Sequence, residues 1–440
     1  MSLSRGVGLG SLGLSNSLPN LGGPGTEDGS DPTTRFAPGA NSAWDFINNY
    51  ARFKDVYYGP LANTPNRTFT RASTAYYTNS AGVLTSVASG VLRTGDRGSL
   101  IEGAGTNLCL QSQTFDNATW AKSNVTVTAD AAVAPDGTTT ADRIEVTAAA
   151  STTLYQQNIT ATATAATASI YVKNGNLGAS DCDDFLIRNV TTSTNIAGGK
   201  FDWTTGIFTA STGGTATVTS LANGWYRITI SISSGITISD NLRFWVGAVG
   251  NTETAGQYFY GWGAQLEATA YASSYIPTTT ASATRAADSL TVTGVTGLDF
   301  PLSLYCEFER ASDSGAGEVL FAVSNGTSGD RLQLEVNSSD LARAQITAGS
   351  AGQFDETVAT AIATGTVNKL AARGATNDAR FAKNGTLSNA DATVTLPATP
   401  NKISFGLNPT GSSPFYGYLR RAAIFSRALS DGELQALTAA

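Results

Sequence analysis

Two segments of this 440-residue chain each place a tryptophan and an arginine on the same side of an expected strand. In 225–232, Trp225 and Arg227 alternate with aliphatic side chains, and in 242–246 Arg243 and Trp245 do the same. An aromatic ring offers a flat apolar surface, and a guanidinium offers paired hydrogen-bond donors. These four residues are therefore candidates for carbohydrate binding, because a sugar ring combines apolar faces with hydroxyls. The alternative is that both tryptophans pack under a loop or against a neighbouring domain.

The acidic run formed by Asp181, Asp183 and Asp184 is the candidate metal site. Ca²⁺ takes several oxygen ligands, and closely spaced carboxylates supply them. The spacing does not match an EF-hand loop, and a solvated acidic turn is the alternative interpretation. No other cofactor is expected.

Composition excludes several classes of chemistry. The chain contains no histidine, so it has no Ser-His-Asp or Cys-His catalytic group and no histidine-ligated zinc. Its net charge of −7 argues against binding nucleic acid by phosphate neutralisation. Glycoside hydrolysis needs only two carboxylates, but the acidic residues are scattered singly. We therefore expect no catalytic residues and no enzyme, with a polysaccharide depolymerase kept as an alternative.

The three cysteines, Cys109, Cys182 and Cys306, are an odd number without a CxxC spacing. They are expected to be free thiols in a protein assembled in a reducing cytoplasm. Glycines interrupt the apolar residues of the N-terminus, and no later stretch approaches the 18 apolar residues of a membrane helix. We expect no signal peptide and no membrane insertion.

Short alternating runs separated by turn residues follow one another from about residue 65, which indicates an all-β protein. Without intervening helical patterns, such strands form antiparallel sheets packed as sandwiches. A change of composition near 277–297 separates two sets of strands. One helix closes the chain, where Ser430 and Glu433 have the spacing of a capping box. Residues 1–40 are rich in Gly, Ser, Pro and Leu and are expected to be irregular.

The first set of strands resembles a module that recurs in tailed-phage fibre and spike proteins and is related to CenC-type carbohydrate-binding modules. The segments that carry the resemblance are TFTRASTAYYTNSAGV (68–83), LIEGAGTNLCLQSQTFDNATW (100–120), VAPDGTTTADRI (133–144), NGWYRITIS (223–231) and YGWGAQLEATAYASSYIPTTTASATRAAD (260–288). The resemblance implies a β jelly roll.

The second set ends in FYGYLRRAAIFSRALSDGELQAL (415–437), preceded by RFAKNGTLS (380–388). This ending resembles that of a concanavalin A-like, laminin-G-type lectin domain, in which a long last strand leads into a short amphipathic helix. Sandwiches of this type host binding, catalysis and purely structural roles, so the fold alone does not assign an activity.

Together these observations predict tandem antiparallel β-sandwiches, a jelly roll followed by a concanavalin A-like domain, behind an irregular Gly-rich anchor. The expected divisions are an anchoring segment (1–40), a neck (41–99), a jelly roll (100–286) and a lectin-type domain (287–440).

The resemblance implies a fibre or spike subunit on a phage virion surface, assembled in the host bacterial cytoplasm. It would attach to other virion proteins through its N-terminal segment and to host-surface polysaccharide through its sandwiches. A homotrimer is expected, or a pentamer on a capsid vertex. The alternatives are a decoration protein that binds nothing and a capsule depolymerase.

Overall fold

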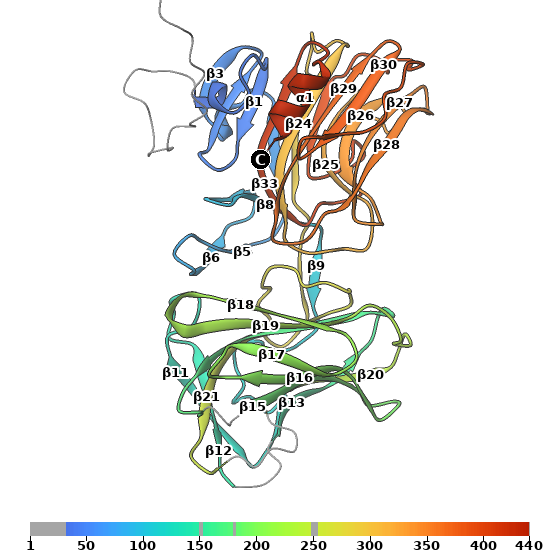
Figure 1. The fold of residues 1–440 in the computed structure, drawn as a ribbon. Coiled ribbons are helices and arrows are strands. Elements are labelled where there is room, and N and C mark those ends of the chain that lie inside the picture. Colours follow the sequence, from blue (N-terminus) through green and yellow to red (C-terminus); the bar gives the residue numbers. More distant parts are fainter. Residues whose placement is uncertain (1–31, 149–152, 179–181, 248–253, 440) are drawn as a thin grey trace, which may run out of the picture.

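The computed structural model describes residues 32–148, 153–178, 182–247 and 254–439. Within them the chain forms two antiparallel β-sandwiches, which Figure 1 shows one above the other. The short helices are η1 (Pro32–Arg35), η2 (Leu61–Asn63), η3 (Ala222–Gly224) and α1 (Asp431–Thr438). The predicted all-β class is confirmed, and so is the capping box at the start of α1, where Ser430 and Glu433 bond to each other's backbone N–H.

One sandwich, which we call the lectin-type sandwich, consists of a ten-stranded and a seven-stranded sheet. The ten-stranded sheet has the order β3-β2-β1-β33-β24-β29-β30-β31, with β8 and then β7 attached to β33. Its strands are β1 (Ser42–Asp45), β2 (Tyr50–Phe53), β3 (Val56–Pro60), β7 (Arg93–Gly95), β8 (Gly98–Ile101), β24 (Leu302–Arg310), β29 (Val367–Ala375), β30 (Asp378–Lys383), β31 (Thr386–Leu387) and β33 (Gly417–Phe425). The seven-stranded sheet runs β28 (Ala351–Ala361), β27 (Leu341–Ala348), β26 (Arg331–Val336), β25 (Glu318–Ser324), β32 (Lys402–Phe405), β23 (Ser289–Thr293), β4 (Arg67–Thr70).

The other sandwich, the jelly roll, has two six-stranded sheets. One sheet, here called the open sheet, runs β10 (Trp120–Ser123), β13 (Thr153–Thr160), β20 (Asn241–Val246), β15 (Cys182–Asn189), β16 (Thr194–Asp202), β17 (Ile207–Thr212). The other, the covered sheet, runs β11 (Val125–Ala132), β12 (Ala141–Val146), β21 (Tyr258–Glu267), β14 (Ala166–Asn174), β19 (Trp225–Ile232), β18 (Thr215–Ser220). Aliphatic and aromatic side chains from both sheets fill the core between them.

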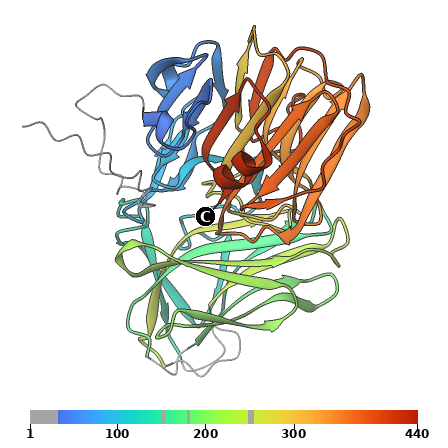
Figure 2. The ribbon, with the colours of Figure 1, turned by 45° about the horizontal axis from the view of Figure 1, so that its top comes forward.

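Residues 41–99, expected as a neck, contribute strands to both sheets of the lectin-type sandwich. β1 pairs with β33, and β4 pairs with β23, more than 200 residues away in sequence. Trp44 explains the placement of β1, because its buried ring lies 5.0 Å from that of Phe405 in the core. Figure 2 shows these blue strands beside the red C-terminal ones. The jelly roll is thus inserted between β8 and β23 of the lectin-type sandwich.

The chain crosses between the sandwiches twice, at β9 (Gly105–Asn107) and β22 (Ala283–Arg285), which pair with each other. Beside them the hairpin β5 (Ala75–Thr78) and β6 (Leu84–Val87) reaches towards the covered sheet. Tyr76 and Leu84 of this hairpin pack against aromatic side chains on the outer face of that sheet. The hairpin therefore covers this face, and for that reason we call the sheet the covered sheet.

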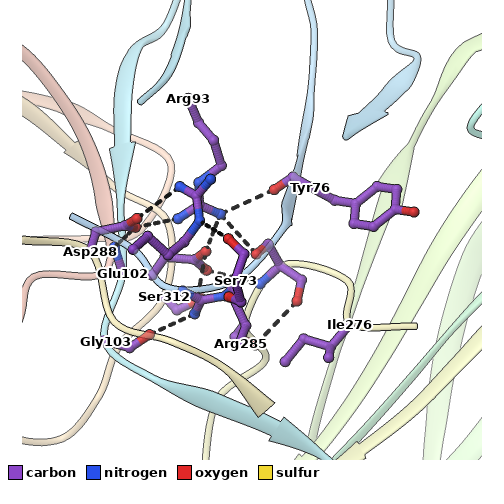
Figure 3. Close-up of polar contacts among 12 residues, drawn as sticks. Ser73, Tyr76, Arg93, Glu102, Gly103, Ile276, Arg285, Asp288 and Ser312 are labelled. Carbon is purple, nitrogen blue, oxygen red and sulfur yellow. Dashed lines mark hydrogen bonds and ion pairs between the residues drawn. The ribbon is translucent and has the colours of Figure 1, made fainter. Parts of the chain in front are cut away.

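A buried ionic cluster joins the segments at this crossing (Figure 3). Arg93 bonds to Glu102 at 2.6 Å and also to Asp288, which in turn accepts a hydrogen bond from Arg71 at 3.1 Å. Arg285 lies 3.6 Å from Glu102 and donates to the carbonyl oxygen of residue 103 at 2.6 Å. All five side chains are at most 7% exposed, so the two carboxylates are compensated by the three arginines and not by solvent. Arg93 also donates to Ser274 Oγ, and Glu102 accepts from the backbone N–H of Ser274, so the cluster ties the segment that follows the last strand of the jelly roll to the lectin-type sandwich.

Candidate glycan-binding face

The outer face of the open sheet carries two aromatic side chains on adjacent strands. Alternation along β13 and β20 directs Leu154 and Phe244 into the core, so that Tyr155 and Trp245 lie on the outside. The two outward residues are direct partners in the register of these strands. Their rings stack with centroids 5.1 Å apart and planes 16° from parallel, and both side chains remain partly exposed.

Two arginines extend this face. The guanidinium carbon of Arg243 lies 4.7 Å from the ring centroid of Tyr155, a cation–π contact. Arg188 on β15 is the register partner of Arg243. We call Tyr155, Trp245, Arg188 and Arg243 the aromatic-arginine face. It offers flat apolar surface beside hydrogen-bond donors, the combination that a sugar requires.

The structure separates the two predicted tryptophan-arginine pairs. Arg243 and Trp245 lie together on the aromatic-arginine face. Trp225 lies on the covered sheet, is 1% exposed and donates a hydrogen bond from its indole N–H to the carbonyl oxygen of Val133 at 3.2 Å. Its ring packs with Trp262 in the cluster beneath the β5–β6 hairpin, so it has no surface to offer a ligand.

Arg227 also lies on the covered sheet. Its guanidinium donates to Ser169 Oγ at 2.9 Å and to the carbonyl oxygen of Ser273 at 2.8 Å. The segment that holds Ser273 also contacts the lectin-type sandwich, where Ser312 Oγ donates to the carbonyl oxygen of Ala272 at 2.9 Å. Arg227 thus stabilises the segment between the sandwiches. Its guanidinium bonds to protein atoms on the covered sheet, and it does not lie on the aromatic-arginine face.

The predicted calcium site falls partly outside the described residues. Asp181 is one of the undescribed residues, and Asp183 is described only by its backbone in β15. Asp184 is 8% exposed and lies opposite Lys200 in β16. Among the residues that the structure describes, no group of three or more acidic, cysteine or histidine side chains could hold a metal ion.

The thiols of Cys109 and Cys306 are free, as predicted, and the structure shows that both are buried. Burial raises the pKa of both thiols well above the usual range, and the neighbouring Glu307 raises that of Cys306 further. Neither thiol is therefore a nucleophile at neutral pH. In the described part of the chain, no helix is long and apolar enough to cross a membrane.

The outer face of the seven-stranded sheet is a second polar surface, of a different kind. Arg343 bonds to Glu335 at 2.9 Å and also to Asp355, and Gln333 donates to Glu335 at 2.6 Å. Burial raises the pKa of Glu335, although Arg343 opposes the effect. Arg343, Glu335 and Asp355 neutralise one another and no aromatic stack accompanies them in these contacts, so the aromatic-arginine face is the stronger candidate for a ligand.

Sequence reasoning missed Tyr155 and Arg188. The available signal was alternation, because both side chains point away from core residues of their strands. Only the register of β13, β20 and β15 places them next to Trp245 and Arg243, and that register joins strands up to about 90 residues apart.

A family model of the concanavalin A-like lectin/glucanases superfamily, of the laminin-G type, matches residues 278–435. This match covers most of the lectin-type sandwich, which is accordingly a concanavalin A-like, laminin-G-type domain. The strands within 42–101 that complete the same sheets lie outside the matched range. The chain matches no curated protein.

Among solved structures, the chain is similar to the carbohydrate-binding module CBM40 of a Ruminococcus gnavus sialidase bound to sialyllactose, with 20% identity over 31% of this chain and 82% of that one (TM-score 0.28). It is also similar to domain 4 of the arabinanase AbnA from Geobacillus stearothermophilus, with 16% identity over 38% of this chain and 80% of that one (TM-score 0.30). Mouse laminin α1 domains LG4–5 match at 12% identity over 64% of this chain and 90% of that one (TM-score 0.24).

Proposed function

We propose that this protein is a fibre or spike subunit on the surface of a phage virion, and that it attaches the particle to host-surface polysaccharide. The observation that carries the binding role is the aromatic-arginine face, which presents stacked rings and cationic donors on an outward-facing sheet. The virion role is supported by the fibre-type segments between residues 68 and 288 and by the lectin-type ending of the chain.

In this proposal each copy binds weakly, and a homotrimer gains avidity from several faces at once. The Gly-rich segment 1–40 joins the subunit to other virion proteins; residues 1–31 of it lie outside the described part of the chain. Arg227 and Ser312 each bond to the segment that holds Ala272 and Ser273, and these contacts limit how the binding faces of an oligomer are directed.

The test is binding of the purified oligomer to a glycan array and to capsule and lipopolysaccharide from bacterial hosts. Trp245→Ala and Tyr155→Ala remove the stacked rings and are expected to weaken binding at least about tenfold, equivalent to about 1.4 kcal/mol. Tyr57→Ala is the matched control, because Tyr57 belongs to another exposed aromatic pair, with Tyr50, on the lectin-type sandwich.

Three results would redirect the proposal. If the control weakens binding as much as Trp245→Ala, the face is not the site. Failure of the wild-type oligomer to bind any glycan, with normal adsorption of particles that lack it, would indicate a decoration protein. Release of reducing ends from host polysaccharide would indicate a depolymerase.

A further inference from the structure

Arg188 and Arg243 are direct register partners on adjacent strands of the open sheet. Both point outward, because Ile187 and Phe244 beside them in sequence lie in the jelly-roll core. The Cα atoms of such antiparallel partners are about 4.5–5.5 Å apart, and two like charges directly opposite each other are destabilising. The sheet therefore keeps a pair of cations at a cost to its own stability.

No carboxylate among the described residues compensates this pair. Arg188 donates to the neutral amide oxygen of Asn195 at 2.9 Å, and Arg243 has its contact with the Tyr155 ring but no hydrogen bond to a described residue. The next outward carboxylate along β15 belongs to Asp184, about 13 Å away by strand spacing and opposite Lys200. Other arginines in this chain do have acid partners, as Arg310 has in Glu318 at 2.9 Å and Arg343 in Glu335 at 2.9 Å.

The position of the Trp245 and Tyr155 rings determines where an acidic group of a bound sugar would lie. Trp245 is two residues from Arg243 on the same strand, which places its Cα about 7 Å away. A pyranose that contacts the exposed part of Trp245 can therefore extend a ring substituent to the arginine pair. Guanidinium groups bind carboxylates through two parallel hydrogen bonds, and the cation–π contact of Arg243 holds its plane in place.

We infer that the aromatic-arginine face binds an acidic saccharide, with the sugar ring against the exposed part of Trp245 and a sugar carboxylate between Arg188 and Arg243. This inference rests on the proposed glycan-binding function and specifies its ligand class. The net charge of −7 repels a polyanion at long range, but that repulsion is screened beyond about 8 Å at physiological salt. The local pair of cations then decides the preference.

The test uses the full-length oligomer on an array of oligogalacturonate and hyaluronan oligosaccharides, each printed beside its carboxyl-reduced, neutral form. Mannan and cellulose oligosaccharides and sulfated glycans complete the array. We expect binding to an acidic member, at least tenfold weaker binding to its reduced form, and further weakening in 0.5 M salt. Arg243→Gln and Arg188→Gln are each expected to lose at least tenfold, with partial recovery in Arg243→Lys.

Arg427→Gln is the control, because it removes an exposed arginine from the lectin-type sandwich. If neutral glycans bind through Trp245 and neither arginine variant changes that binding, the proposed function stands and the acidic ligand is refuted. Binding to sulfated members alone refutes the carboxylate. If no member of the array binds, both the proposed function and this inference fail.

Discussion

Replacing Glu102 with glutamine would test the ionic cluster that joins the two sandwiches. Burial raises the pKa of the Glu102 carboxyl, but Arg285 and Arg93 outweigh burial and lower this pKa from 4.5 to about 2. Because a tenfold change in acidity is worth 1.36 kcal/mol, the native carboxylate contributes about 3 kcal/mol to the free energy of unfolding at pH 7. This contribution agrees with the free energy of unfolding that is lost when one partner of a buried ion pair is removed, which is about 3–5 kcal/mol.

The sign of the pH dependence follows from the lowered pKa. The contribution of Glu102 is complete above pH 4.5 and is lost as the pH falls towards 2, because the unfolded chain takes up the proton first. Glu102→Gln lacks this group, so its deficit relative to the wild type should shrink by about 2 kcal/mol between pH 7 and pH 3. Urea unfolding of both proteins, followed by circular dichroism at several pH values, measures the difference.

The control for this experiment is Glu433→Gln. Arg427 and Ser430 hold the pKa of Glu433 at about 2 as well, but this ion pair is exposed to solvent. Exposed pairs contribute about 0–1 kcal/mol, so we expect a small loss. If the deficit of Glu102→Gln is the same at pH 7 and pH 3, or no larger than that of the control, the assignment of the cluster as a stabilising junction is refuted.

Three further predictions concern the cores and the helix. Trp225→Ala should lower the free energy of unfolding by about 3–5 kcal/mol, measured by urea titration, and leave glycan affinity unchanged because the ring is buried. In a Cys182→Ser background, Cys109 and Cys306 should resist iodoacetamide until urea unfolds the protein, as followed by mass spectrometry; rapid labelling of the native protein would contradict their burial. Ser430→Ala should cost about 1 kcal/mol through loss of the helix cap, and an unchanged thermal midpoint would argue against that role.

Local patterns in the sequence predicted the elements of this fold well. The alternation of Leu242, Phe244 and Val246 marks the core side of β20, and the spacing of Ser430 and Glu433 marks the start of α1. Both features depend on residues within one strand or one turn, so a short window contains the necessary information.

Long-range pairing could not be predicted in the same way. Trp225 and Trp245 have equivalent positions opposite aliphatic rows, yet one is buried and the other partly exposed. The difference arises from the β5–β6 hairpin, which covers only one of the two sheets and lies about 140 residues earlier in the chain. Likewise, nothing within 67–70 indicates that β4 pairs with β23. These contacts depend on loop closure over long distances, which leaves no local periodicity.

The two crossing strands lie side by side, so the inserted jelly roll can be exchanged as a unit. Gly105 pairs with Arg285, and the hydroxyls of Thr106 and Thr284 lie 2.8 Å apart, so the ends of the jelly roll meet side by side. A module attached in this way can be excised and its ends joined by a short turn without removing a strand from the lectin-type sandwich. A different binding module with neighbouring termini can equally be grafted there. If the proposed function holds, glycan specificity is then exchanged together with the inserted module, while the lectin-type sandwich keeps its sequence.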